Sequence, residues 1–68
     1  MTSTPFVLAV ARMNKGLSQR ALAAKVGVGL ETVRRLENGL GARPANAKKV
    51  ADFFDVQVTD LLPLEEAA

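Results

Sequence analysis

Hydrophobic residues along the chain recur at spacings of three and four residues, and the alternation typical of β-strands is weak throughout. One run comprises Leu22, Ala23 and Val26, and the next comprises Val33 and Leu36. The longest run consists of Ala47, Val50, Ala51 and Phe54. These spacings place the apolar side chains of each run on one face of an α-helix. The pattern therefore predicts short helices that each bury one face.

Residues that begin and end helices separate these runs. Thr4–Pro5 and Pro44 suit helix starts, because the first turn leaves its amides unbonded and proline has no amide hydrogen. Ser18 and Thr59 can cap helices with their hydroxyl groups, and Gly27 can end a helix in the left-handed conformation. The predicted helices are 5–14, 19–26, 30–38, 44–54 and 59–62. Their short connections predict an all-α fold, a compact five-helix bundle.

The length of 68 residues predicts a single domain, with its core over residues 4–62 and a short tail at 63–68. A chain this short buries only about 60% of the surface that its unfolded form exposes, so the core is thin. Cysteine and histidine are both absent. Their absence removes thiolate metal ligands and the commonest general base, and no paired carboxylates are expected at a pocket. We therefore expect no enzymatic activity, no cofactor and no bound metal.

No segment of the sequence is predicted to cross a membrane. The longest apolar stretch, residues 6–11, is far shorter than the roughly 20 residues that a spanning helix needs. No basic region precedes this stretch and no clear cleavage site follows it, so it is not expected to be a signal peptide. A cytoplasmic location is the expectation.

The charged residues are segregated along the chain. Residues 1–49 contain all nine Lys and Arg and two of the acidic residues, a net charge of +7, whereas residues 50–68 contain five acidic residues and no basic one. A protein with one basic end and one acidic end orients itself in the field of a polyanion. Chance segregation on a charged, solvated surface is the alternative interpretation.

Residues 16–39 contain two of the predicted helices, joined by a turn of about three residues around Gly27. Such a turn lets the second helix, 30–38, cross the first steeply and project from the body of the domain. A projecting helix of this size fits the major groove of DNA, which is about 12 Å wide. Paired helices of this kind also occur in proteins that bind no DNA, so the geometry favours DNA binding without requiring it.

At this point the sequence resembles a known family. The resemblance rests on Arg12, Lys15-Gly16-Leu17-Ser18-Gln19, Leu22-Ala23, Val26-Gly27-Val28, Thr32-Val33, Arg35-Leu36-Glu37-Asn38-Gly39 and Pro44. These residues and their spacings look like those of the phage repressor and Cro-type helix-turn-helix family, over residues 8–62 without an obvious gap. The resemblance implies a lambda-repressor-like fold and binding to double-stranded DNA through the recognition helix, 30–38.

The resemblance also implies which residues contact the DNA backbone, and it implies one structural ion pair. Gln19 matches the family's glutamine that holds a phosphate beside the positively polarised start of a helix. The full backbone set is Ser18, Gln19, Gly29, Thr32, Asn38 and Arg43. Lys48 is a weaker candidate, because it and Lys49 suit a solvated face. Arg12 and Glu37 match a pair that bridges the first and third helices of the family, and its role is structural.

The residues implied to read bases are Leu30, Glu31, Arg34 and Arg35. Leu30 offers only apolar contact, to a thymine methyl group, or else packs back on Val33. Glu31 can accept a hydrogen bond from a cytosine amine. The alternative is that it is only a surface residue whose negative charge compensates the positive end of the helix dipole. Arg35 is expected to read guanine, and Arg34 to contact phosphate or only solvent. The family usually has Ser or Thr where this chain has Gly29, so the cap of this helix is weaker.

These inferences lead to a transcriptional regulator of a prokaryote or a phage, associated with the nucleoid when bound. Because one such domain reads few base pairs, two copies on a two-fold site are expected. The homodimer would use apolar residues of the acidic end, namely Phe53, Val58, Leu61, Leu62 and Leu64. An antitoxin-like module that binds a protein partner, and an accessory DNA-bending protein of phage recombination, are the alternatives.

Overall fold

The computed structural model describes residues 6–62, which form four α-helices and one short 3₁₀ helix. The elements are α1 (Leu8–Asn14), α2 (Gln19–Val26), α3 (Leu30–Glu37), α4 (Pro44–Phe54) and the 3₁₀ helix η1 (Val58–Asp60). No strand occurs within residues 6–62. The all-α class is confirmed, whereas the predicted count of five helices is not, because the last element is a single 3₁₀ turn of three residues.

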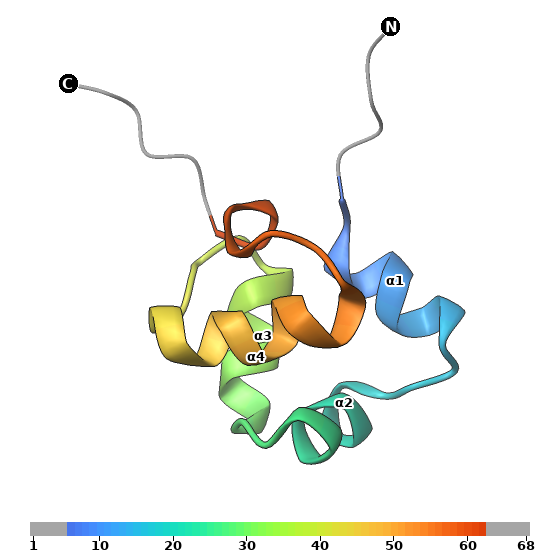
Figure 1. The fold of residues 1–68 in the computed structure, drawn as a ribbon. Helices are drawn as coiled ribbons and strands as arrows, with labels where there is room; N and C mark the ends of the chain where they lie inside the picture. Colours follow the sequence, from blue (N-terminus) through green and yellow to red (C-terminus); the bar gives the residue numbers. More distant parts are fainter. Residues whose placement is uncertain (1–5, 63–68) are drawn as a thin grey trace, which may run out of the picture.

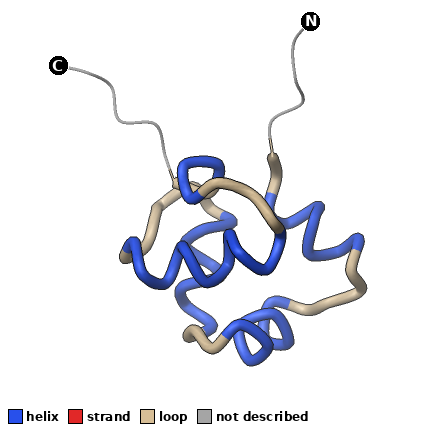
Figure 2. The backbone as a smooth tube through the Cα atoms, in the orientation of Figure 1, coloured by secondary structure: helices blue, strands red, loops and turns tan. Residues whose placement is uncertain are grey.

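Helix α3 lies at the centre of this arrangement and contacts α1, α2 and α4. Figure 1 shows α4 crossing α3 steeply, and Figure 2 shows that short loops connect the helices. Residues 6 and 62 lie at the same end of the molecule, away from α2 (Figure 1). Helix α2 is therefore away from both ends of the described chain, whereas the C-terminal end of α3 lies near them.

The bounds of α2 agree with the sequence prediction, and the residues expected to set them do so. The Oγ atom of Ser18 accepts a hydrogen bond from the amide of Ala21 at 3.0 Å. Gly27 follows the helix with φ 78° and ψ 38°, a left-handed conformation that only glycine adopts without a steric penalty. Its amide donates to the carbonyl of Ala23 at 2.9 Å, which closes the last turn.

The first helix begins later than predicted. Residues 6 and 7 are not helical, and Val7 is extended with φ −119° and ψ 110°, so α1 starts at Leu8. The expected N-cap, Thr4–Pro5, lies outside the described residues. The ring of Phe6 packs on Phe54, with 5.9 Å between the ring centroids, and this tertiary contact favours an extended chain at the start of α1.

The last element also differs from its prediction. Thr59 was expected to cap a helix over 59–62, but it lies inside η1, and Gln57 occupies the N-cap position. The Gln57 amide donates to the Asp60 carboxylate at 3.0 Å. Asp55, just after α4, has a positive φ of 57° and turns the chain before η1 begins. The turn is therefore capped by a carboxylate, and the Thr59 assignment is wrong.

The core is small and draws on all four helices and on the segment after η1. Its buried residues are Leu8, Leu22, Ala23, Val33, Leu36, Ala47, Val50, Ala51 and Leu61. Leu22, Val33 and Val50, one each from α2, α3 and α4, are completely buried. Burying a side chain of this size contributes about 1.5–3 kcal/mol, so these three residues hold the helices of the α2–α3 pair on α4.

The core includes one residue that the sequence analysis assigned to a dimer surface. Leu61 is buried within the domain and is only 5% exposed, so it cannot form an intermolecular contact. Phe53, Val58 and Leu62 are partly buried against the same core. Leu64 lies outside the described residues. The prediction that Leu61 belongs to a dimer surface is therefore wrong, because its side chain is part of the core of the domain.

Candidate nucleic-acid interface

Helices α2 and α3 pack against each other and are joined by three residues, Gly27, Val28 and Gly29. Val28 packs against the core, which fixes the middle of the turn. Gly29 is the N-cap of α3 and has no side chain to cap it. The amide of Thr32 is bonded to the Gly29 carbonyl at 3.1 Å. Helix α3 thus begins without a side-chain cap, and its first turn is held by backbone contacts.

The two faces of α3 differ sharply. Val33 and Leu36 are buried, whereas Glu31 and Arg34, one turn apart, are exposed on the other side. Leu30, the first residue of α3, is partly exposed and lies next to Glu31. Three of the four residues expected to read bases are therefore accessible at the start and middle of one helix.

Arg35, the fourth of these residues, is exposed but engaged. Its Nε atom donates to the carbonyl of Gly41 at 3.2 Å, and its Nη2 atom donates to the carbonyl of Leu40 at 3.2 Å. The guanidinium is therefore directed at the α3–α4 loop. Sequence reasoning missed these partners, because a backbone carbonyl can accept from any donor and leaves no residue-type signal.

The residues expected to contact the DNA backbone from α2 lie at its first turn. Ser18 is exposed, and its Oγ atom is engaged as the N-cap acceptor. Gln19 is partly buried, and its Nε2 atom donates to Glu37 Oε1 at 2.9 Å. A side-chain amide nitrogen carries two hydrogens, so one donor of Gln19 is held by α3 and the second is left for another acceptor.

The structure brings Arg12 and Glu37 together as a bidentate pair between α1 and α3. Arg12 Nε lies 2.5 Å from Glu37 Oε2, and Arg12 Nη2 donates to Glu37 Oε1 at 3.3 Å. Arg12 Nη1 donates to the carbonyl of Leu17 at 2.7 Å. The two side chains are only 13% and 7% exposed. The Glu37 carboxylate thus joins α3 to α1 and α2, and the Arg12 guanidinium also binds the α1–α2 loop.

The electrostatics of the pair follow from this geometry. The hydrogen bond to Glu37 raises the pKa of Arg12 above its ordinary value, and the charge of Glu37 adds to the rise. Burial opposes this by lowering the pKa of Arg12, but the carboxylate outweighs it. Arg12 therefore stays charged across the physiological pH range. Because its pKa is higher in the folded state than in the unfolded state, the pair stabilises the folded protein at every pH below the pKa of the unfolded state.

Thr32, Asn38 and Arg43 complete the expected backbone contacts. Thr32 is partly buried in the first turn of α3. Asn38 is exposed at the C-terminal end of α3, where its amide donates to the Arg34 carbonyl at 3.0 Å. Arg43 is exposed at the N-cap position of α4. Asn38 and Arg43 thus lie at the two ends of the α3–α4 loop, beyond the recognition helix.

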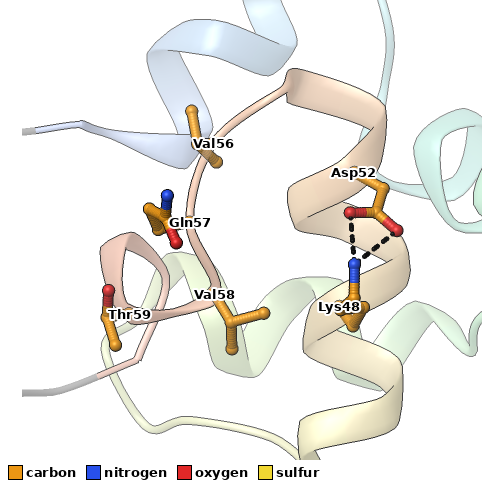
Figure 3. A pocket seen from close by; sticks show the side chains of 6 residues that line it. All are labelled: Lys48, Asp52, Val56, Gln57, Val58 and Thr59. Carbon is orange, nitrogen blue, oxygen red and sulfur yellow. Dashed lines mark hydrogen bonds and ion pairs between the residues drawn. The ribbon is translucent and has the colours of Figure 1, made fainter.

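The second half of α4 has a different charge pattern. Lys48 Nζ contacts both carboxylate oxygens of Asp52, at 2.8 and 3.0 Å, and this pair is drawn in Figure 3. It borders a shallow hollow of about 340 Å³ between α4 and residues 56–59. Asp55 and Asp60, also exposed, follow α4. Lys48 is therefore paired with a carboxylate on the exposed face of α4.

None of the helices within residues 6–62 has the length and apolar character that crossing a bilayer requires. Exposed basic residues are found on α2, on α3 and in the loop before α4. These residues are Arg20, Lys25, Arg34, Arg35 and Arg43.

The comparisons with known proteins agree with this geometry. A family model described as helix-turn-helix matches residues 8–61, which cover α1 to η1 and the whole core. Searches of curated proteins and of solved structures gave no match. Members of the matched family are DNA-binding regulators, and the match supports sequence-specific DNA binding here. The chain belongs to the Cro/C1-type helix-turn-helix family.

Proposed function

We propose that this protein is a transcriptional regulator of a prokaryote or a phage that occupies an operator with the helix at 30–38 in the major groove. The observation that carries the proposal is the exposed face of α3, with Glu31 and Arg34, beside the first turn of α2. An α-helix with its side chains is about 10–12 Å in diameter, which suits a groove about 12 Å wide.

Base reading is assigned to the exposed residues of α3. Arg34 presents a donor fork that can pair with the O6 and N7 acceptors of guanine or with a phosphate, and Glu31 can accept from a cytosine amine. Leu30 offers apolar contact to a thymine methyl group. Reading guanine with the Nε–Nη2 edge of Arg35 would require both of its loop carbonyl bonds to break.

Backbone contacts are assigned to residues on both sides of α3. Gln19 retains a free donor for a phosphate, and its position is held by Glu37. Arg43 at the start of α4 provides a positive charge on the other side. Ser18, Gly29, Thr32 and Asn38 add polar groups between these two. Such contacts fix the register of the protein on the duplex and are independent of base sequence.

Sequence-specific binding is expected to require two copies of this domain on the DNA. Each good base contact contributes about 1–3 kcal/mol of discrimination, and one short helix makes few of them. A homodimer on half-sites about 10 base pairs apart doubles the number of contacts. Phe53, Val58 and Leu62 remain as candidates for the dimer surface at the acidic end of the domain, with Leu64 beside them in sequence.

The experiment that tests the proposal is selection of bound duplexes from random DNA, followed by titration of the selected site at two salt concentrations. We expect a recurrent two-fold sequence and an affinity that falls steeply with salt, because basic residues release counterions from phosphates. Binding that does not change with salt, or no binding at low salt, would contradict the proposal. Binding without sequence preference would favour a DNA-bending protein.

A matched pair of variants places the contact surface. Arg34→Ala and Lys49→Ala each remove one exposed positive charge, the first from α3 and the second from α4. We expect Arg34→Ala to weaken binding to the selected site markedly and Lys49→Ala to weaken it much less. Equal effects would mean that net charge, and not α3, determines binding.

A further inference from the structure

The loop between α3 and α4, residues 38–43, depends on backbone conformation and on one arginine. Gly39 and Gly41 have φ of 73° and 80°, in the left-handed region where L side chains are strained. The carbonyl of Arg35 accepts from the Leu40 amide at 2.9 Å. The Arg35 guanidinium donates to the carbonyls of Leu40 and Gly41, each at 3.2 Å. Arg35 thus binds two consecutive loop carbonyls from the neighbouring helix.

Few apolar contacts hold this loop against the rest of the domain. The side chain of Leu40 is 59% exposed, so it does not hold the loop against the core. Ala42 is the loop residue that packs on the core, and it offers a single methyl group. A glycine-containing loop has many alternative conformations, so directional hydrogen bonds have a large influence on which one it adopts.

The position of this loop determines the position of Arg43. Arg43 ends the loop as the N-cap residue of α4, and its carbonyl accepts the first helical bond, from Ala47 at 2.9 Å. Its side chain is exposed. A shift of residues 39–42 would therefore move the guanidinium of Arg43 relative to α3.

We propose that Arg35 is a positioning residue, whose guanidinium holds the 38–43 loop and, through it, Arg43 against the DNA backbone instead of reading a base. This proposal rests on the proposed DNA-binding function. The adjacent Arg34 is the contrasting case, since its side chain forms no hydrogen bond or ion pair within residues 6–62. The Arg34 side chain can approach a base or a phosphate directly, whereas the Nε and Nη2 atoms of Arg35 are directed at the loop carbonyls.

The first part of the test needs no DNA. Amide hydrogen exchange of the Leu40 amide is measured by NMR in the wild type, Arg35→Ala, Arg35→Lys and Arg34→Ala. We expect exchange about tenfold faster in Arg35→Ala, because two hydrogen bonds to the loop are lost while the backbone acceptor remains. Arg35→Lys, which keeps one donor group, should lie between, and Arg34→Ala should match the wild type. Unchanged exchange in Arg35→Ala would overturn the proposal.

The second part asks whether Arg35 acts on DNA through Arg43. Binding of Arg35→Ala, Arg43→Ala and the double variant is measured on a selected site and on scrambled DNA at one salt concentration. We expect Arg35→Ala to lower both affinities by the same factor, and the double variant to bind no more weakly than Arg43→Ala alone. A loss confined to the selected site would show that Arg35 reads a base, and additive losses would show that it acts independently of Arg43.

The two parts separate this inference from the proposed function. If the wild-type protein binds no duplex at low salt, the proposed function fails. Exchange at Leu40 then still decides whether Arg35 holds the loop. If the wild type binds DNA and the loop exchange is unchanged in Arg35→Ala, the positioning role fails and the DNA-binding function stands.

Discussion

The two ion pairs within residues 6–62 have similar lengths and very different surroundings. Arg12 and Glu37 are 25 residues apart, join α1 to α3, and have side chains only 13% and 7% exposed. Lys48 and Asp52 are neighbours on α4, four residues apart, and their side chains are 64% and 61% exposed. The shortest separations are 2.5 and 2.8 Å. The distance between the charges therefore does not distinguish the two pairs, but their burial does.

Burial decides what happens when one partner is removed. At the Arg12–Glu37 pair, water has little access, so a remaining charge loses its partner without being solvated. At Lys48–Asp52, water replaces the missing partner at once. The Glu37 carboxylate also accepts from Gln19, so one side chain supports several elements. We therefore expect the region that joins α1 to α3 to be sensitive to mutation and the exposed face of α4 to be tolerant.

The largest effect is expected for Glu37→Ala. The variant leaves Arg12 charged and mostly buried, and loss of one partner from a buried pair costs about 3–5 kcal/mol. A domain of this size rarely has more than about 3–5 kcal/mol of stability, so the variant should be largely unfolded at ambient temperature. Thermal unfolding followed by circular dichroism measures this. A melting temperature within a degree or two of the wild type would contradict the structural role of the pair.

A smaller effect is expected for Gln19→Ala. The change removes one hydrogen bond to Glu37 but leaves Arg12 and Glu37 paired, so the free energy of unfolding should fall by about 1 kcal/mol. Binding to selected and scrambled DNA should weaken by the same factor, because a phosphate contact is independent of sequence. Arg20→Ala, at the adjacent exposed position, controls for stability. A loss confined to the selected site would assign Gln19 to base reading instead.

Ser18→Ala should cost about 1 kcal/mol of stability, because the Ala21 amide loses its capping acceptor. Ser18→Asn provides the matched control, since asparagine is an equally good N-cap residue and should retain most of the stability. Chemical denaturation of the three proteins compares them directly. If the alanine and asparagine variants are equally destabilised, the Ser18 hydroxyl has another role.

The smallest effect is expected for Asp52→Ala. An exposed pair four residues apart on a helix contributes about 0.3–0.5 kcal/mol, so the melting temperature should change little. Lys48→Ala should behave in the same way. If either variant is destabilised as much as Glu37→Ala, the contrast between the two pairs is wrong, and burial is not what distinguishes them.

The sequence was sufficient where the signals are local. The bounds of α2 follow from Ser18 and Gly27, and the start of α4 follows from Pro44 at its first position. Each of these residues acts on its own backbone or on amides within the same turn, so its effect is independent of the rest of the chain. The apolar spacing likewise identified the buried faces, including Leu22, Val33 and Val50.

Prediction failed where a distant contact overrides a local preference. Phe6 packs on Phe54 and the chain around it is extended, so α1 does not begin at the predicted position. The error at η1 has a different, local cause, because the Asp60 carboxylate accepts from the Gln57 amide three residues earlier and Thr59 does not cap. The α1 start could not be read from neighbouring residues, because it depends on an element more than forty positions away.

For the candidate site too, some features follow from the sequence and others only from the tertiary structure. Its residue types, the helix-turn-helix spacing and the basic character of residues 1–49 are determined by the sequence alone. Only the tertiary structure decided which of the charged side chains are engaged: Glu37 with Arg12 and Gln19, and Arg35 with the loop carbonyls. It also placed Leu61 in the core and not on the surface. The physical reason is that helix formation and the apolar face of a helix arise from neighbouring residues. The partner of a long polar side chain depends instead on which backbone and carboxylate groups the packed helices bring within its reach.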